Sequence, residues 1–307
     1  MIKTLKKTWK KIDHFYEKHY KALLIIPFLI LVISLCFLGY KYYTTGSLIE
    51  LGISLSGGLT ITIPSQNHID INEISQLLQK NIKNDFEIRE ISEFGEQKAI
   101  TISVAAKEGD DLNKLEKEVI NLINQKIPYA KETYSVEIMG PSLGKSFLQQ
   151  TVKSLIVAFL FMALTVFFYF RTLVPSSAVV LAAFSDMVET LAIISFMGMK
   201  LSTAGIAAFL MLIGYSVDTD ILLSTRVLKR REKSVYERIK SAIGTGFLMN
   251  LTTLAAVSVA LIITQSAVIE QIMTILLIGL LLDIINTWIQ NAGILRLYAE
   301  SKEAKKK

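Results

Sequence analysis

Acidic side chains lie inside segments that are otherwise apolar enough to cross a membrane. These acids are Asp186, Glu189, Asp218, Asp220 and Asp283. A charged group at the centre of a bilayer costs about 2.5–3.5 kcal/mol even on the mildest scale, so such residues normally face a partner or water. Buried carboxyl groups of this kind can take up and release protons. We therefore treat the five acids as candidates for a proton relay, and a polar cluster that only joins helices is the alternative.

The depths of these acids in their segments agree. Counted at about 1.5 Å per residue from the end of each segment, Asp186, Asp218 and Asp283 fall in the same half of the bilayer. Three helices are thus predicted to present carboxyl groups in one layer. Asp220 follows Asp218 by two residues, a spacing that points two side chains to nearly opposite faces of a helix. These two acids are therefore not expected to share a site.

Polar and basic residues near the acids are candidates to support them. Asn286 and Gln290 follow Asp283 at i+3 and i+7, on the same helix face, and Asn250 and Thr253 share a face of another segment. Arg226 lies two turns beyond Asp218 and is the nearest basic group that could keep a carboxyl group ionised. An arginine that only fixes the orientation of the helix is the alternative for Arg226.

Glycines mark three backbone positions. Gly57 and Gly58 precede a predicted strand, where paired glycines allow a bulge or a close backbone approach. The segment from Gly140 and Pro141 to Gly144 and Lys145 has three residues between its glycines, whereas a phosphate-binding loop needs four. We interpret it as a rigid elbow before a membrane helix. Gly214, four residues before Asp218, is predicted to permit a bend.

Six apolar runs are long enough to span a bilayer, which is about 30 Å of hydrocarbon. They cover Ala22–Tyr40, Thr151–Phe170, Ala178–Gly198, Ser202–Leu223, Ile243–Thr264 and Val268–Gln290. The chain of 307 residues is 51% hydrophobic and only 20% charged, a composition that excludes a disordered chain. The first run is too long for a signal peptide, so we interpret it as a retained anchor. The fold class is a multi-pass helical membrane protein.

The net charge of +6 is explained by where the basic residues lie. They cluster at 1–21, at 226–240 and at 305–307, all on one side of a six-span arrangement. The positive-inside rule then predicts a protein of the cell membrane with both termini in the cytoplasm. No nucleic-acid partner is needed to explain the positive charge. Binding of an anionic lipid or a ribosome is the alternative for these clusters.

Residues 41–150 form a polar stretch that the neighbouring spans place outside the membrane. Strand patterns occur at 59–63, 86–91, 99–105 and 134–139, and helical stripes occur at 71–82 and 112–123. The order strand, helix, strand, strand, helix, strand is that of the ferredoxin-like arrangement. The predicted division of the chain is a basic N-terminus (1–21), an anchor (22–40), this outer domain (41–150), five further spans (151–295) and a basic tail (296–307).

Metal, cofactor and enzyme chemistry receive no support from the residue types. Cys36 is the one cysteine, which excludes an intrachain disulfide and a cysteine-based metal site. The three histidines are too scattered to predict a zinc site. We expect no cofactor, no metal and no enzymatic activity.

Three motifs resemble a known family. Gly52–Thr60 is similar to its glycine-pair entry strand, Met139–Gly144 to its elbow before the second span, and Ile213–Asp220 to its fourth-span motif. On these motifs the chain resembles the archaeal SecF branch of the SecD/SecF protein-export family, within the resistance–nodulation–division superfamily. The resemblance covers nearly the whole chain, and an outer region of about 110 residues favours SecF over SecD.

The resemblance implies partners and an activity. The partners would be a SecD-like six-span subunit, the Sec channel, an unfolded exported polypeptide and membrane lipid. The activity would be assistance to protein translocation, driven by the proton gradient. Two alternatives stay open: a non-conducting scaffold that stabilises the translocation channel, and a small-molecule transporter of the resistance–nodulation–division type, which would need a large apolar outer pocket.

Overall fold

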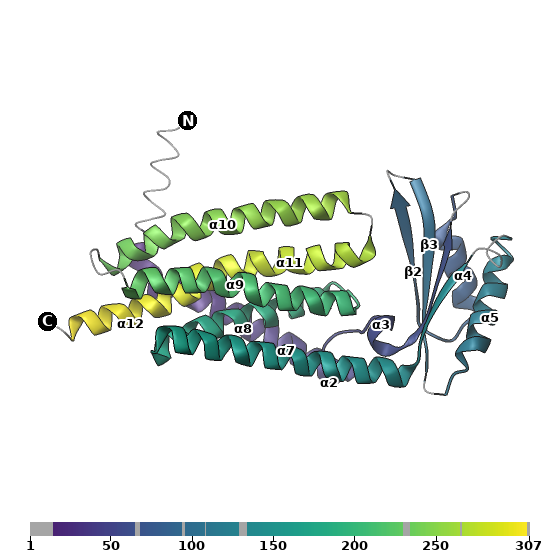
Figure 1. Cartoon of the computed structure of the whole chain (residues 1–307), viewed down its shortest axis with the longest axis horizontal. Helices are drawn as coiled ribbons and strands as arrows, with labels where there is room; N and C mark the ends of the chain where they lie inside the picture. The colour runs from purple at the N-terminus through teal and green to yellow at the C-terminus, as the bar shows by residue number, and fades with distance from the viewer. Residues whose placement is uncertain are drawn as a thin grey trace.

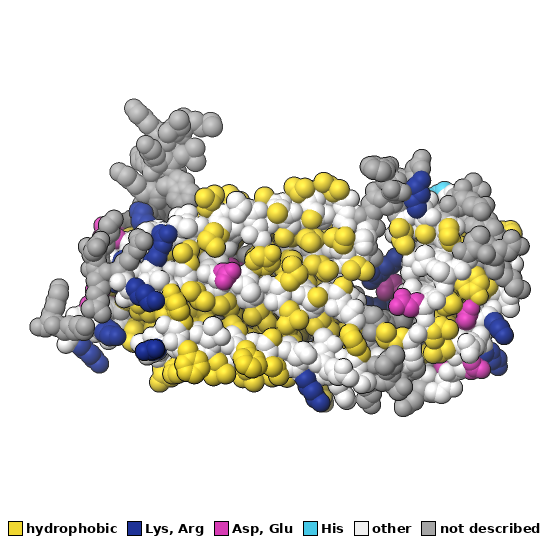
Figure 2. Space-filling view, viewed as in Figure 1, with side chains coloured by type: hydrophobic (Ala, Val, Ile, Leu, Met, Phe, Trp, Pro, Cys, Tyr) yellow, Lys and Arg dark blue, Asp and Glu magenta, His cyan; other side chains and the backbone are white. Residues whose placement is uncertain are grey.

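The computed structural model describes residues 15–64, 68–93, 96–107, 109–128, 134–229, 234–264 and 266–305. A long helical bundle occupies one end of the molecule and a sheet with two covering helices occupies the other (Figure 1). The predicted basic residues at 1–14, 230–233 and 306–307 lie outside the described ranges. Figure 2 shows hydrophobic side chains over the face of the bundle that is in view, and Lys and Arg side chains at its end remote from the sheet.

Six candidate membrane spans are present in the described residues, as predicted. They cover Phe15–Thr45, Ser146–Phe170, Leu173–Phe196, Thr203–Lys229, Val235–Ile263 and Val268–Ala304. The helices of these spans are α2 (Ile25–Thr45), α7 (Pro141–Phe170), α8 (Leu173–Phe196), α9 (Thr203–Lys229), α10 (Val235–Ile263), α11 (Ala267–Ile285), the π-helix η1 (Asn286–Asn291) and α12 (Ala292–Ala304). The first, fifth and last spans extend about two to four turns beyond the predicted apolar runs, because the terminal turns carry polar residues.

The outer domain has the predicted order of elements. It consists of β1 (Gly58–Pro64), α4 (Ile71–Asn81), β2 (Phe86–Glu93), β3 (Glu96–Ala105), α5 (Leu112–Asn124) and β4 (Ser135–Met139). The strands form one antiparallel sheet in the order β2-β3-β1-β4. This is the ferredoxin-like arrangement predicted from the alternating and helical patterns.

Local signals begin the two helices of this domain and one sheet face forms its core. Asp70 and Asp111 cap α4 and α5 by accepting hydrogen bonds from backbone N–H groups of the first turn. Leu59, Ile61 and Ile63 alternate along β1 and are buried against the two helices. The helices cover the face of the sheet that is turned away from the bundle (Figure 1).

The two glycine motifs meet at the neck between the outer domain and the bundle. A short helix, α3 (Ile53–Ser56), precedes β1, and α7 begins at Pro141 directly after β4. A Cβ on Gly144 would lie 2.7 Å from the Gly57 nitrogen, and one on Gly58 would lie 2.2 Å from the Val104 oxygen. Both positions therefore need glycine because backbone approaches backbone there.

A second link holds the chain after the first span against the outer ends of the bundle helices. The Gly52 N–H donates to the Leu201 carbonyl over 2.8 Å, and the Leu201 N–H donates to the Glu50 carbonyl over 2.8 Å. The Ser195 hydroxyl also donates to the Leu48 carbonyl over 2.8 Å. These bonds tie the base of the outer domain to the connection between α8 and α9.

A buried layer of carboxyl groups as the candidate functional site

Four of the five candidate acids lie together in the interior of the bundle. Asp186 and Glu189 come from α8, Asp220 from α9 and Asp283 from α11, and each side chain is at most 1% exposed. Three helices thus contribute carboxyl groups to one buried layer, as the depth argument predicts. The acid from α9 in this layer is Asp220 rather than Asp218.

One amide group joins the two acids of α8. The Asn286 side chain donates to an Asp186 oxygen over 2.8 Å and to a Glu189 oxygen over 2.9 Å. Both N–H groups of the amide are used in these bonds. The second oxygen of Asp186 accepts a hydrogen bond from the Ser216 hydroxyl of α9 over 2.6 Å. The amide and the hydroxyl thereby hold α8 against α9 and η1.

A hydroxyl group joins the other two acids. The Thr287 oxygen lies 3.0 Å from an Asp220 oxygen and 2.9 Å from an Asp283 oxygen. A hydroxyl group has a single hydrogen to donate, so it cannot satisfy two charged carboxylates at once. Asp220 also accepts from Asn291 over 2.7 Å, and Asp283 accepts from Asn250 over 3.0 Å.

The π-helix explains how so many polar groups reach this layer from one segment. Asn286, Thr287, Gln290 and Asn291 are all fully buried within η1. A π-turn has i→i+5 hydrogen bonds and carries an extra residue, so it widens the face that a helix presents to its neighbours. Such single turns occur frequently at functional sites.

Buried oxygen atoms of the acids and of other residues on the same helices lack hydrogen-bond partners. Within the described residues these buried atoms include Glu189 Oε1, Asp220 Oδ2, Asn286 Oδ1, Gln290 Oε1, Asn291 Oδ1, Thr190 Oγ1 and Ser224 Oγ. A buried polar atom without a partner costs about 1–3 kcal/mol. A set of acceptors this dense accommodates donors such as protons or bound water.

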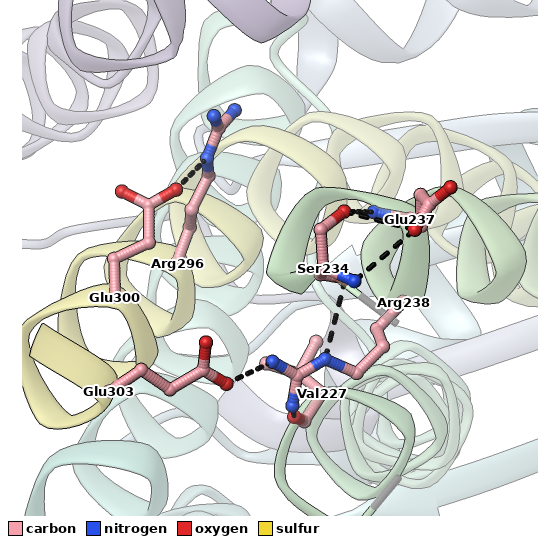
Figure 3. Close-up of polar contacts among 7 residues, drawn as sticks. All are labelled: Val227, Ser234, Glu237, Arg238, Arg296, Glu300 and Glu303. Carbon is pink, nitrogen blue, oxygen red and sulfur yellow. Dashed lines mark hydrogen bonds and ion pairs between the residues drawn. The ribbon is translucent and has the colours of Figure 1, made fainter. Parts of the chain in front are cut away.

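The buried basic residues pair with acids outside this layer. Arg238 and Arg296 are the buried basic residues of the described chain. They pair with Glu303 and Glu300 (Figure 3), which lie on α12 at the end of the bundle opposite the outer domain (Figure 1). None of the ion pairs among the described residues involves an acid of the buried layer. In the same part of the chain, no group of three His, Cys, Asp or Glu side chains is arranged to hold a metal ion.

Asp218 lies on the opposite side of α9 from Asp220, as their spacing predicts. Its side chain is exposed on the outer surface of the bundle, next to Arg226 and Met249 in a groove of about 580 Å³. The Arg226 guanidinium donates to Ser241 and Thr245 of α10. The structure therefore separates Asp218 and Arg226 from the four buried acids.

Of the supporting residues predicted from spacing, some lie in the buried layer and others lie outside it. Asn250, Asn286 and Gln290 are buried in or beside the layer, and Gln290 donates to the Ser185 hydroxyl over 3.3 Å. Thr253 bonds to the Met249 carbonyl of its own helix and lies outside the layer. Gly214 lies within the continuous helix α9, and a Cβ there would meet open space.

Sequence reasoning missed further members of the network. They are Ser216, Thr219, Thr287 and Asn291. The i+4 spacing from Asp283 to Thr287 and from Thr287 to Asn291 would have placed two of them on the acidic face. Hydroxyl groups in membrane helices give a weak signal because they also bond to their own helix carbonyls.

Comparisons with known proteins agree on one family. The family model described as "Protein export membrane protein SecD/SecF, C-terminal" matches residues 119–301. The protein-export membrane protein SecF of Pyrococcus furiosus is 38% identical over 296 residues, which cover 96% of this chain and 97% of the relative. The SecF protein of Methanocaldococcus jannaschii is 37% identical over 94% of this chain and 99% of the relative.

A solved structure has the same fold. The crystal structure of SecDF, a translocon-associated membrane protein from Thermus thermophilus, superposes with a TM-score of 0.69 at 17% sequence identity. The match covers 94% of this chain and 38% of the SecDF chain, so this chain corresponds to one part of that longer protein. A second SecDF structure gives a TM-score of 0.60 at 19% identity.

Proposed function

The chain belongs to the SecD/SecF family of protein-export membrane proteins, and from this premise we propose that it couples proton movement to polypeptide export. In this proposal it pairs with a SecD-like six-span subunit beside the Sec channel. The complex then assists the passage of an unfolded polypeptide, and the proton gradient supplies the energy.

The buried layer of Asp186, Glu189, Asp220 and Asp283 carries the proposal. Four uncompensated negative charges in an apolar bundle are too costly to maintain, so we expect the layer to hold protons. The Thr287 hydroxyl contacts oxygens of both Asp220 and Asp283. Because it has one hydrogen, both contacts become hydrogen bonds only when one of these carboxyl groups carries a proton. The layer is therefore suited to a shared, movable proton.

The links between bundle and outer domain supply a route for the energy. A proton that moves down the membrane potential releases about 2.3 kcal/mol per 100 mV. A change in charge alters the attraction between α8, α9 and η1, which meet at the layer. The bonds of Leu201 join the α8–α9 connection to the segment that precedes the sheet, and the contact of Gly144 with Gly57 joins α7 to the same segment. A shift of the helices would thus tilt the outer domain.

The exposed face of α9 and α10 is the proposed contact with the SecD-like subunit. Tyr215, Phe247, Leu248 and Met249 expose apolar surface on this face, and Asp218 lies among them. A carboxyl group in contact with lipid is unfavourable, so a polar group of a neighbouring protein is its expected partner. Asp218 then serves the interface and the four buried acids serve proton transfer.

The proposed orientation follows from charge, with both termini in the cytoplasm and the sheet outside. The edge strand β4 is the proposed contact for the exported chain. Val136 and Ile138 are more than one-third exposed there, and an extended peptide can add to a free sheet edge through main-chain hydrogen bonds.

The test compares Asp220→Asn with Asp218→Asn. Each variant is reconstituted in vesicles with its SecD-like partner and the Sec channel, and proton flux and polypeptide transport are measured together. We expect Asp220→Asn to lower both by at least about tenfold, equivalent to about 1.4 kcal/mol. Asp218→Asn should lower the yield of the complex and leave the flux per complex unchanged. Unaltered flux in an intact Asp220→Asn complex would overturn the proposal.

A scaffold function is the second candidate, because each buried acid accepts at least one hydrogen bond and the layer also joins helices. A scaffold predicts that Asp220→Asn lowers thermal stability and that no proton flux exists to lose. A small-molecule transporter has less support. The groove of about 540 Å³ between sheet and bundle is lined by polar residues such as Glu87, Arg89 and Lys200.

A further inference from the structure

A cationic cavity lies at the end of the bundle remote from the outer domain. It measures about 440 Å³ and is bordered by the last turns of α7, α9 and α12 and the first turns of α8 and α10. Three basic residues and one acid contribute to its lining, namely Lys229, Arg238, Lys302 and Glu303. The cavity therefore carries an excess of positive charge. None of these residues belongs to the carboxyl layer.

Neighbouring groups hold the basic side chains in place around the cavity. The Arg238 guanidinium donates to the Val227 carbonyl over 2.7 Å and pairs with Glu303 of α12 (Figure 3). The Lys229 ammonium lies 4.1 Å from the centre of the Tyr169 ring. The Lys302 ammonium contacts the Tyr298 hydroxyl over 3.4 Å. Arg238 therefore joins three helices, and the two lysines lie at the cavity with aromatic support.

A buried hydroxyl group without a partner and a helix N-terminus add hydrogen-bond donors to the cavity. Thr172 lines the cavity and occupies the N-cap position of α8, but its side chain makes no capping bond. Its hydroxyl oxygen is buried and has no hydrogen-bond partner. A helix N-terminus carries a partial positive charge and free N–H groups, which suit a phosphate group.

An apolar groove begins at the same turn of the chain. It measures about 560 Å³ and runs between α7 and α8, from Phe167 and Leu173 to Phe159 and Phe184. Both cavities border the α7–α8 turn, since Thr172 lines the cationic cavity and the next residue, Leu173, lines the groove. The Leu173 side chain is 72% exposed. A polar cationic cavity next to an apolar groove fits a molecule with an anionic head and an apolar tail.

We propose that this pair of cavities binds one phospholipid with a net negative headgroup. The phosphate lies between Lys229, Lys302 and the Thr172 hydroxyl, and an acyl or alkyl chain lies along the groove between α7 and α8. Basic pockets between membrane helices at the level of the headgroups are a recurrent form of lipid recognition. The bound lipid would join α7 and α8 to the ends of α9 and α12.

The test uses the purified full chain in detergent and two lipids with identical acyl chains. Binding of phosphatidylglycerol and phosphatidylcholine is measured by native mass spectrometry and by thermal shift, with inorganic phosphate as a third ligand. We expect saturable binding of one phosphatidylglycerol, at least about tenfold weaker binding of phosphatidylcholine, and no displacement of the lipid by millimolar phosphate.

Variants separate this site from general attraction of anionic lipid. Lys229→Gln with Lys302→Gln should weaken phosphatidylglycerol binding by about tenfold or more, since each lysine near a headgroup contributes about fivefold. The control removes two exposed lysines of the outer domain, Lys80→Gln with Lys114→Gln, and should leave binding unchanged. Ser177→Trp fills the apolar groove and should weaken lipid binding without altering the charge.

Three outcomes would overturn the proposal. The first is equal binding of both lipids. The second is a loss of phosphatidylglycerol binding in the Lys80→Gln and Lys114→Gln control that equals the loss in the Lys229→Gln and Lys302→Gln variant. The third is phosphatidylglycerol binding that inorganic phosphate abolishes, because the cavity would then take a free phosphate group and the apolar groove would have no part. Binding is measured without transport, so the result is independent of the proposed proton coupling.

Discussion

The core of the outer domain is aliphatic, whereas the helix bundle buries four carboxyl groups in addition to its apolar clusters. Leu59, Ile61 and Ile102 belong to an outer core made of aliphatic side chains that are almost completely buried. The bundle buries Asp186 and Asp220 just as deeply, although lipid surrounds it. Stability alone explains the first core. The second holds groups whose burial is unfavourable, which indicates that they are kept for what they do.

The largest expected effect tests the aliphatic core. Ile61→Ala should destabilise the outer domain by about 2–5 kcal/mol, because Ile61 is fully buried in a central strand. Val136→Ala provides the control, since Val136 pairs with Ile61 across the sheet but is more than one-third exposed. Its effect should stay below about 1 kcal/mol. Urea denaturation followed by hydrogen exchange measures both, and equal losses would contradict this description of the core.

A glycine contact in the bundle gives the next largest effect. A Cβ on Gly246 would lie 2.3 Å from the Trp288 ring, so Gly246→Ala should cost about 1–3 kcal/mol through overpacking. Gly244→Ala, two residues earlier in the same helix, meets open space and should stabilise α10 by about 1 kcal/mol. Thermal unfolding in detergent should therefore shift in opposite directions for the two variants. Shifts in the same direction would show that α10 is not packed as described.

The hydrogen bonds of the polar layer should contribute less to stability than the packing of Ile61 or of Gly246. Asn286→Leu removes the amide that joins Asp186 and Glu189, and we expect a loss of about 1 kcal/mol, as is typical of hydrogen bonds between membrane helices. Thr253→Val, whose hydroxyl bonds only to its own helix carbonyl, should be close to neutral. A loss of several kcal/mol for Asn286→Leu in thermal unfolding would favour the scaffold function.

The smallest effect concerns a carboxylate that faces water. The Lys107 backbone N–H and the Asn84 amide donate to Asp110 and lower the pKa of its carboxyl group. A lowered folded-state pKa means that Asp110 stabilises the fold above about pH 4, the unfolded value, and that this contribution is lost as pH falls through the folded pKa. Asp110→Asn should therefore differ from the parent at neutral pH and converge with it in acid. Urea denaturation across pH 2–7 measures this, and a constant difference would exclude the ionised Asp110 as its cause.

The fold follows from the sequence to a large extent. Alternation at 59–63 and the stripes at 71–82 and 112–123 predicted the outer domain, and length with hydropathy predicted the spans. These patterns are periodic, and period is what sequence analysis detects well. The interpretation of the elbow at Gly140 as a rigid turn agrees with the close contact of Gly144 with the glycine pair.

The site followed from the sequence only in part. Depth in the bilayer predicted a layer of acids, but depth does not say which face of α9 is turned inward. Asp218 and Asp220 were both candidates, and packing against α8 and η1 buries Asp220. Thr287 and Asn291 were missed although they follow Asp283 at i+4 and i+8, because the prediction took only the polar residues at i+3 and i+7. The π-helix buries both pairs.

The extra residue in η1 also sets the rotation of everything that follows it. Inserting one residue into an α-helix turns the remainder by about 100° about its axis. The face of α12 that packs through Leu295 and Ala299 is therefore offset from the face that α11 buries. Shortening this segment by one residue would restore a regular helix but rotate Arg296 and Glu300 away from the first span. There the Arg296 guanidinium now lies over the Tyr20 ring, and the Tyr20 hydroxyl donates to Glu300. The last span therefore consists of two α-helices, α11 and α12, whose buried faces point in different directions. The π-helix that joins them lies at the level of the acids.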